Sequence, residues 1–300
     1  LHELPFTDPK KGEFRIAAQV KNAVYAYVPP RFQPPGALPW PALTQLSGEL
    51  VFDRASMRIK GANARFAGLP DTRILKADAV IEDLVHAEVQ VTADVRGPLT
   101  EALGLVAASP LAEMTSHALH TTTATGAADY RLKLGLPIHA IDTSTVEGSV
   151  TLAGNDVRMT PDTPLLARAK GVVGFTGNGF SLNAVQARLL GGDVRLDGGL
   201  QVAPAAVEGG NVNAAPTLQV RAQGVLSAEG LRQARELGFL SRLADRATGT
   251  AAYSAVLGLR RGVPELQVTS NLQGMALDLP APLRKPADSV LPLRFEKALA

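Results

Sequence analysis

The chain contains no cysteine, which excludes disulfide bonds, thiolate metal sites and cysteine nucleophiles. Aromatic residues make up only 5% of it and charged residues only 19%. The 30 basic and 28 acidic residues leave a formal net charge of +2, so no strong field attracts nucleic acid. No window approaches the roughly 18 consecutive apolar residues of a membrane span, and no leader-like segment opens the chain.

The apolar residues that are present are mostly small or aliphatic. Hydrophobic residues reach 46% of the 300-residue chain, which together with the low charge excludes intrinsic disorder. The 28 glycines and 21 prolines amount to about one residue in six, which favours many turns over long helices. The length allows two average domains or one large β domain.

Alternation of apolar and polar residues is the dominant pattern. It is clear over residues 13–21, 89–96 and 129–136, and shorter runs follow to about residue 268. Each run is bounded by Gly, Pro, Asn or Asp, which are turn residues. The pattern predicts an antiparallel sheet with one apolar face and one hydrated face.

Two stretches instead show helical spacing, near residues 98–119 and 227–247. Pro98 suits the first position of a helix, and Ser109-Pro110 predicts a break into two short helices. Ser227 is a candidate N-cap for the second stretch. We expect both stretches to cap the sheet.

The surroundings of the two helical stretches match. Val89–Ala93 precedes the first and Leu218–Ala222 precedes the second, while residues 126–130 and 249–253 follow them. This predicts a strand–helix–strand unit that occurs twice in an elongated, curved antiparallel sheet. The chain is expected to divide into β-groove segments 1–145 and 146–300, or to form one continuous elongated domain.

Several motifs occur in an order that resembles a known family. They are Trp40–Leu43 leading into Leu46–Phe52, then Tyr130–Pro137, Gly148–Asn155 and the closing Leu279–Ala287. Together they cover most of the chain and resemble the YhdP-type, AsmA-like envelope proteins of Gram-negative bacteria.

The resemblance implies a segment of a very long periplasmic protein, anchored in the inner membrane by an N-terminal helix outside this sequence. It implies transport of phospholipid towards the outer membrane in an apolar β-groove, and hence a role in outer-membrane permeability. The implied partners are phospholipid acyl chains and neighbouring segments of the same chain, with no nucleic acid. The family supplies no catalytic residue and no cofactor, so the chain is expected not to be an enzyme.

The candidate site is the apolar face of the predicted sheet, formed by every second residue of each strand. Shielded there, an acyl chain would avoid water while its headgroup stayed hydrated. The residues predicted to line the groove are Phe52, Ile59, Val91, Leu132, Leu134, Leu152, Phe175, Leu182, Val194 and Leu196.

Other interpretations are open at this point. His117 and His120 have a spacing that binds zinc on a helix, but Thr121-Thr122-Thr123 continues a helix poorly. The glycines of residues 171–179 invite a phosphate-loop interpretation, but a strand and not a helix follows them. The densest acidic cluster lies at residues 78–83 and fits a strand edge. The main alternative function is a periplasmic β-sandwich scaffold whose apolar face is a filled core.

Overall fold

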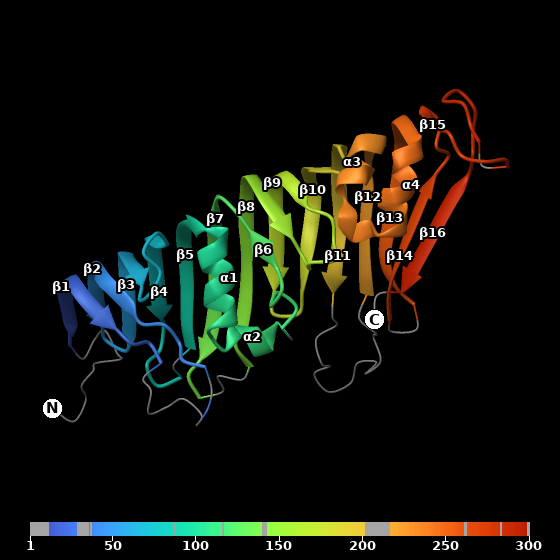
Figure 1. Ribbon diagram of the computed structural model, residues 1–300. Helices are drawn as coiled ribbons and strands as arrows, with labels where there is room; N and C mark the ends of the chain where they lie inside the picture. Colours follow the sequence, from blue (N-terminus) through green and yellow to red (C-terminus); the bar gives the residue numbers. More distant parts are fainter. Residues whose placement is uncertain are drawn as a thin grey trace, which may run out of the picture. The chain divides into compact units, whose positions relative to one another are not determined.

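The structure, a computed structural model, describes residues 12–28, 36, 38–86, 88–115, 117–139, 143–201, 217–260, 263–282 and 284–298. These residues form sixteen strands and a few short helices (Figure 1). The long strands follow one another across an open sheet in the order of the sequence, and the pairings are antiparallel. The predicted fold class, mainly β with an antiparallel sheet and short helical insertions, is confirmed.

The chain divides into two compact units, of which the first comprises residues 1–120 and 127–150. Its strands pair in the order β1-β2-β3-β4-β5-β7. The strand that follows, β8 (Thr145–Arg158), begins in this unit and continues in the other. The remaining elements of the first unit are β1 (Arg15–Tyr25), β2 (Leu43–Asp53), β3 (Ser56–Phe66), β4 (Arg73–Ile81), β5 (Glu88–Pro98), α1 (Leu99–Ala107), α2 (Leu111–Met114) and β7 (Ala127–Pro137).

The second unit comprises residues 121–126 and 151–300. Its long strands continue in sheet order from β8 to β14 and end at β16, while β6 pairs with β8 and β15 pairs with β13. Its elements are β6 (Thr123–Ala124), β9 (Leu166–Thr176), β10 (Gly179–Leu189), β11 (Gly192–Gln201), β12 (Thr217–Ser227), α3 (Ala228–Gln233), α4 (Phe239–Leu243), β13 (Ala247–Arg260), β14 (Val263–Ser270), β15 (Met275–Leu277) and β16 (Leu293–Ala298), with 3-10 helices at Arg235–Leu237 and Ala244–Arg246.

The predicted repeat is present and extends to the strand register. In the first unit β5 and β7 enclose α1 and α2, and in the second β12 and β13 enclose α3 and α4. Tyr130 lies opposite Val95 in the first pair, and Tyr253 lies opposite Gly224 in the second. The same correspondence holds along both pairs, so the two units share one local design.

Both helical stretches are broken into short helices, which the sequence predicted for the first stretch only. α1 ends before Ser109-Pro110, where the break was predicted. Ser227 is the N-cap of α3, and its hydroxyl oxygen accepts a hydrogen bond from the backbone N–H of Gly230 at 3.0 Å. Gly238, at φ 57°, separates the 3-10 helix Arg235–Leu237 from α4.

Several strands contain a residue in the left-handed conformation whose backbone N–H is held by a side chain of a neighbouring strand. The backbone N–H of Gly61 donates to a carboxylate oxygen of Asp78 at 2.7 Å, and that of Ala184 donates to Asp197 at 2.8 Å. The register shifts at both places, which marks a β-bulge. Since bulges bend a strand and increase its twist, these carboxylates hold the strands in a bent form. Two further N–H groups in this conformation are held in the same way, at Asn22 by Ser47 and at Arg168 by Asp156.

Candidate functional site

One face of the first unit carries apolar side chains from every strand. Directly opposite residues of paired strands share a face. Val91 lies opposite Leu134 on β7 and opposite Ala79 on β4, and Ala79 lies opposite Ile59 on β3. The structure brings five of the predicted lining residues together on this face: Phe52, Ile59, Val91, Leu132 and Leu134.

The opposite face of the same strands is charged. Arg96 lies 3.3 Å from Asp129, and Arg131 lies 3.7 Å from Asp94. All four side chains are more than half exposed, so these ion pairs add little to stability. They keep this face hydrated, which leaves the apolar face as the one available to a hydrophobic ligand.

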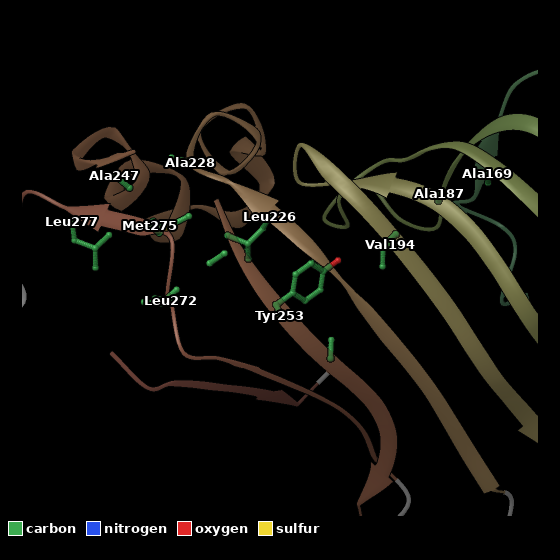
Figure 2. Packing of buried hydrophobic residues seen from close by; sticks show 12 residues of the cluster. Ala169, Ala187, Val194, Leu226, Ala228, Ala247, Tyr253, Leu272, Met275 and Leu277 are labelled. Atoms are coloured by element: carbon green, nitrogen blue, oxygen red, sulfur yellow. The ribbon is translucent and has the colours of Figure 1, made fainter. Parts of the chain in front are cut away.

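The second unit has a corresponding apolar face. Leu182 on β10 lies opposite Val173 on β9, and Ala187 on the same strand lies opposite Val194 on β11. Alanine is frequent in the cluster of buried residues on this face (Figure 2). The other predicted lining residues are here: Phe175, Leu182, Val194 and Leu196 lie on the face, and Leu152 of β8 packs against its cluster.

Burial changes along the strands of each apolar face. In the first unit Val95 is 5% exposed, whereas Val91, four residues earlier on the same face of β5, is half-buried. In the second unit Val194 is 3% exposed, whereas Leu196 is half-buried. Nine of the ten predicted residues are half-buried, and Val194 belongs to the closed core. Each apolar face therefore has a buried part and a half-buried part, and a ligand could contact only the latter.

The bulges lie at the boundary between these two parts. On β3, Gly61 separates half-buried Ile59 from Ala62, which is buried. On β10, Ala184 separates half-buried Leu182 from Val185, which is also buried. The strands therefore bend where the closed core ends.

Other half-buried side chains share these faces with the predicted residues. The same alternation that identified Val91 and Leu182 also identifies other side chains on these faces, which sequence reasoning left out. Half-buried side chains on the same faces are Leu50, Phe180, Leu200, Val220 and Leu257.

The helical segments lie at the buried end of the strands. α3 packs against the core of the second unit through Ala228, which is buried, and Leu231. α1 is fastened to the turn before β4, because the Glu101 carboxylate accepts hydrogen bonds from the Thr72 hydroxyl at 2.6 Å and the Asp71 N–H at 3.2 Å. In each unit the helices thus lie at one end of that unit's strands, and the half-buried rows lie towards the other end.

Two tyrosines lie at corresponding pairs of the two units, Tyr130 opposite Val95 and Tyr253 opposite Gly224. Tyr130 packs against the core of the first unit and Tyr253 belongs to the core of the second. Burial raises the pKa of each phenol to about 12, so both are neutral at physiological pH. Among the described residues neither phenolic oxygen has a hydrogen-bond partner.

The comparisons with known proteins agree with this architecture. The family model described as YhdP protein matches residues 1–300, which is the whole chain. The chain belongs to the YhdP family. No curated protein and no solved structure matches it. In the described part of this YhdP-family chain, no helix has the length and apolar character needed to cross a membrane.

The acidic cluster predicted near a strand edge serves the fold. Asp78 accepts the bulge N–H of Gly61, Glu82 lies 3.2 Å from Arg58, and Asp83 lies 2.8 Å from His86. The Gly61 N–H is the main reason why the pKa of Asp78 is lowered. Each carboxylate already has a partner, and within the described ranges no group of three or more His, Asp or Glu side chains is arranged to hold a metal.

The two remaining motifs of the YhdP-family chain are structural. The glycines of residues 171–179 belong to the hairpin of β9 and β10, as their sequence predicted, with no helix following. His117 and His120 line a cavity of about 20 Å³ between α1 and the turns after α2, which is about the size of one water molecule.

A larger hollow of about 350 Å³ lies along β13, β14 and β16 and is lined mainly by the hydrated face. Its polar groups pair with one another: Glu296 accepts hydrogen bonds from Arg294 at 2.7 Å and from Gln267 at 2.9 Å. This arrangement leaves the apolar faces as the better candidate for ligand contact.

Proposed function

We propose that this chain is a non-enzymatic segment of a bridge-like lipid transport protein, in which the half-buried apolar rows shield phospholipid acyl chains between the inner and outer membranes. The observation that carries the proposal is that in each unit one face of the strands is apolar and the other is charged, and that rows of aliphatic side chains on the apolar face are only half-buried. Membership of the YhdP family supports it.

The proposal has a clear energetic basis. Exposing an acyl chain to water costs ~0.8 kcal/mol per methylene, or on the order of 25 kcal/mol for two sixteen-carbon tails. Leucine, valine and phenylalanine side chains replace water around the methylenes without a specific geometry, so selectivity among acyl chains is expected to be loose. The proposed location is the periplasmic side of the inner membrane, with anchorage supplied by chain outside this sequence.

The direct test is native mass spectrometry of the purified chain, followed by organic extraction and analysis of the released lipid. Stoichiometric phospholipid is the expected result. A lipid-free protein of 31.4 kDa, also after incubation with phospholipid vesicles, would contradict the proposal and favour a scaffold with a filled core.

The apolar rows are tested by paired substitutions on adjacent residues. Leu134→Asp places a charge on the half-buried row of β7, whereas Lys133→Asp places the same residue on the exposed, hydrated face. We expect Leu134→Asp to abolish most of the lipid capture and Lys133→Asp to leave it unchanged. Leu152→Asp and Thr151→Asp form a second pair in the other unit.

Circular dichroism of all four variants separates binding from folding. A charge at a half-buried site costs stability, but the folded spectrum should persist. If Leu134→Asp and Leu152→Asp both unfold the chain, these positions belong to the core and the apolar rows lose their proposed role.

A further inference from the structure

Two loops of the first unit carry exposed apolar side chains at the end of the strands that lies away from the helices. In the loop between β4 and β5, Leu84 is 38% exposed and Val85 is 69% exposed. In the loop between β7 and β8, Ile138 is 52% exposed. Both loops adjoin the pair Glu88–Pro137, whereas α1 follows β5 at the other end of the same ladder. We call Leu84, Val85 and Ile138 the apolar rim.

The apolar rim continues the half-buried rows of this unit. On β7 every second residue from Leu132 to Leu136 is half-buried, and Ile138 is the next residue in this alternation. On β5 the residue opposite Leu136 is Val89, which is also half-buried, and Val85 precedes it by four residues. Apolar side chains therefore extend from the core of the first unit to the rim, and their exposure increases in that direction.

Hydrogen bonds hold the loop between β4 and β5 in place. One oxygen of the Asp83 carboxylate accepts the backbone N–H of Val85 at 2.9 Å, and the other lies 2.8 Å from the ring nitrogen Nδ1 of His86. The backbone N–H of Leu84 donates to the Ala55 carbonyl at 2.8 Å, which fastens the loop to the turn between β2 and β3. The fold thus fixes the backbone of Leu84 and Val85 and leaves both side chains in water. Adjacent exposed apolar side chains on a fixed backbone mark a candidate contact site.

The position and chemistry of the apolar rim indicate its partner. The helical insertion lies at the other end of these strands, so an acyl chain that leaves the half-buried rows over a strand end does so at the rim. Aliphatic side chains at that point keep part of the moving chain out of water and require no particular geometry of it. The acyl chain of a phospholipid therefore fits the rim, and the rim is continuous with the rows proposed to shield such chains.

We propose that the apolar rim is the place where phospholipid acyl chains pass between a bilayer and the half-buried rows of the first unit. The proposal rests on the proposed lipid function and adds to it a point of entry and exit. Because the rim lies outside the rows, it determines how fast lipid enters and leaves, whereas the rows determine how much lipid is held. This difference between rate and amount makes the proposal testable separately from the lipid function.

The test measures the rate and the amount of lipid capture with one label. The purified chain is mixed with phosphatidylcholine vesicles that contain pyrene-labelled phosphatidylcholine, and the loss of excimer fluorescence is followed until it is complete. We expect Val85→Asp combined with Ile138→Asp to slow capture about tenfold, the effect of leaving about two more methylene groups in water at the barrier. Release into unlabelled vesicles should slow by the same factor, so the amount bound at equilibrium should stay unchanged.

Val172→Asp combined with Phe239→Asp is the matched control. Val172 lies on the hydrated face of β9 and is 45% exposed, and Phe239 lies on α4 and is 66% exposed. This control adds the same two charges outside the rim and should exchange lipid at the wild-type rate. Val85→Ile combined with Ile138→Val keeps the rim apolar and should do the same. All four side chains are exposed, so every variant should keep the wild-type circular dichroism spectrum.

Three results would overturn the entry point while the lipid function stands. The first is a wild-type rate of capture in the variant with two charges on the rim. The second is a smaller bound amount at an unchanged rate, because the rim would then belong to the rows that hold the lipid. The third is equal slowing in the rim variant and the matched control, because added charge alone would then slow exchange. If the wild type captures no labelled lipid, the lipid function itself is contradicted, and the entry point with it.

Discussion

At the scale of single residues, the carboxylates beside the bulges have the clearest physical role. Asp78 and Asp197 each accept the N–H of a residue in the left-handed conformation on the neighbouring strand. That N–H points away from the regular ladder and would otherwise be unsatisfied. Each carboxylate therefore stabilises the bend that separates buried from half-buried apolar surface.

This role makes stability depend on pH at Asp78. The Gly61 N–H lowers the pKa of the folded-state carboxyl below its ordinary value of 3.8. The carboxylate therefore stabilises the fold above pH 3.8, and this contribution is lost as the pH falls through the lowered pKa. We expect Asp78→Asn to make the free energy of unfolding depend less on pH below about pH 4. Asp78→Ala should lower the free energy of unfolding by about 1 kcal/mol at pH 7. Urea unfolding between pH 2 and 7 measures both.

Asp129→Asn is the control for this prediction. Asp129 is exposed and pairs with Arg96 across the strands, but it holds no bulge. Equal effects of the Asp78 and Asp129 substitutions on the acid limb would show that general charge, and not the bulge contact, stabilises the fold.

At the scale of elements, the cap of α3 is the simplest point at which to test the helical insertions. α3 has only six residues, so it depends on its N-cap and on contacts with the strands. Ser227→Ala should cost about 1 kcal/mol, because the Gly230 N–H loses its partner. Hydrogen exchange should speed up in α3 and remain unchanged in β1 to β5. Ser181→Ala, on an exposed strand position, should change neither quantity.

Most elements could be predicted from the sequence, because they depend on local patterns. Alternation located the strands, Ser109-Pro110 located the break after α1, and Ser227 marked the start of α3. The bulge at Ala184 could not be predicted, since alanine has no preference for the left-handed conformation and the Asp197 contact is not local.

The exposed fraction of each side chain on the apolar faces could not be predicted from the sequence either. Val194 and Leu196 have the same alternation and the same chemistry, yet Val194 is 3% exposed and Leu196 is half-buried. Val194 belongs to a buried cluster that also contains residues of α3 and β15, which lie far along the chain. Alternation gives the face of a residue but not its depth.

At the scale of the whole molecule, charge and apolarity are separated. The net charge is only +2, and the ion pairs lie on the hydrated faces. If lipid is held by its acyl chains, capture should be equal for zwitterionic and anionic phospholipids and insensitive to ionic strength. Lipid extraction after incubation at 50 mM and 500 mM NaCl tests this. A steep loss at high salt would indicate that headgroup charge, and not the apolar rows, dominates binding.

The matched registers of β5–β7 and β12–β13 have a consequence for how such a chain changes length. Because each helical insertion leaves and re-enters the sheet at the same pairs, Pro98 with Ala127 and Ser227 with Thr250, an insertion can be exchanged without shifting any neighbouring strand. Evolution could therefore change the insertions of a protein of this kind while leaving its strand ladders untouched.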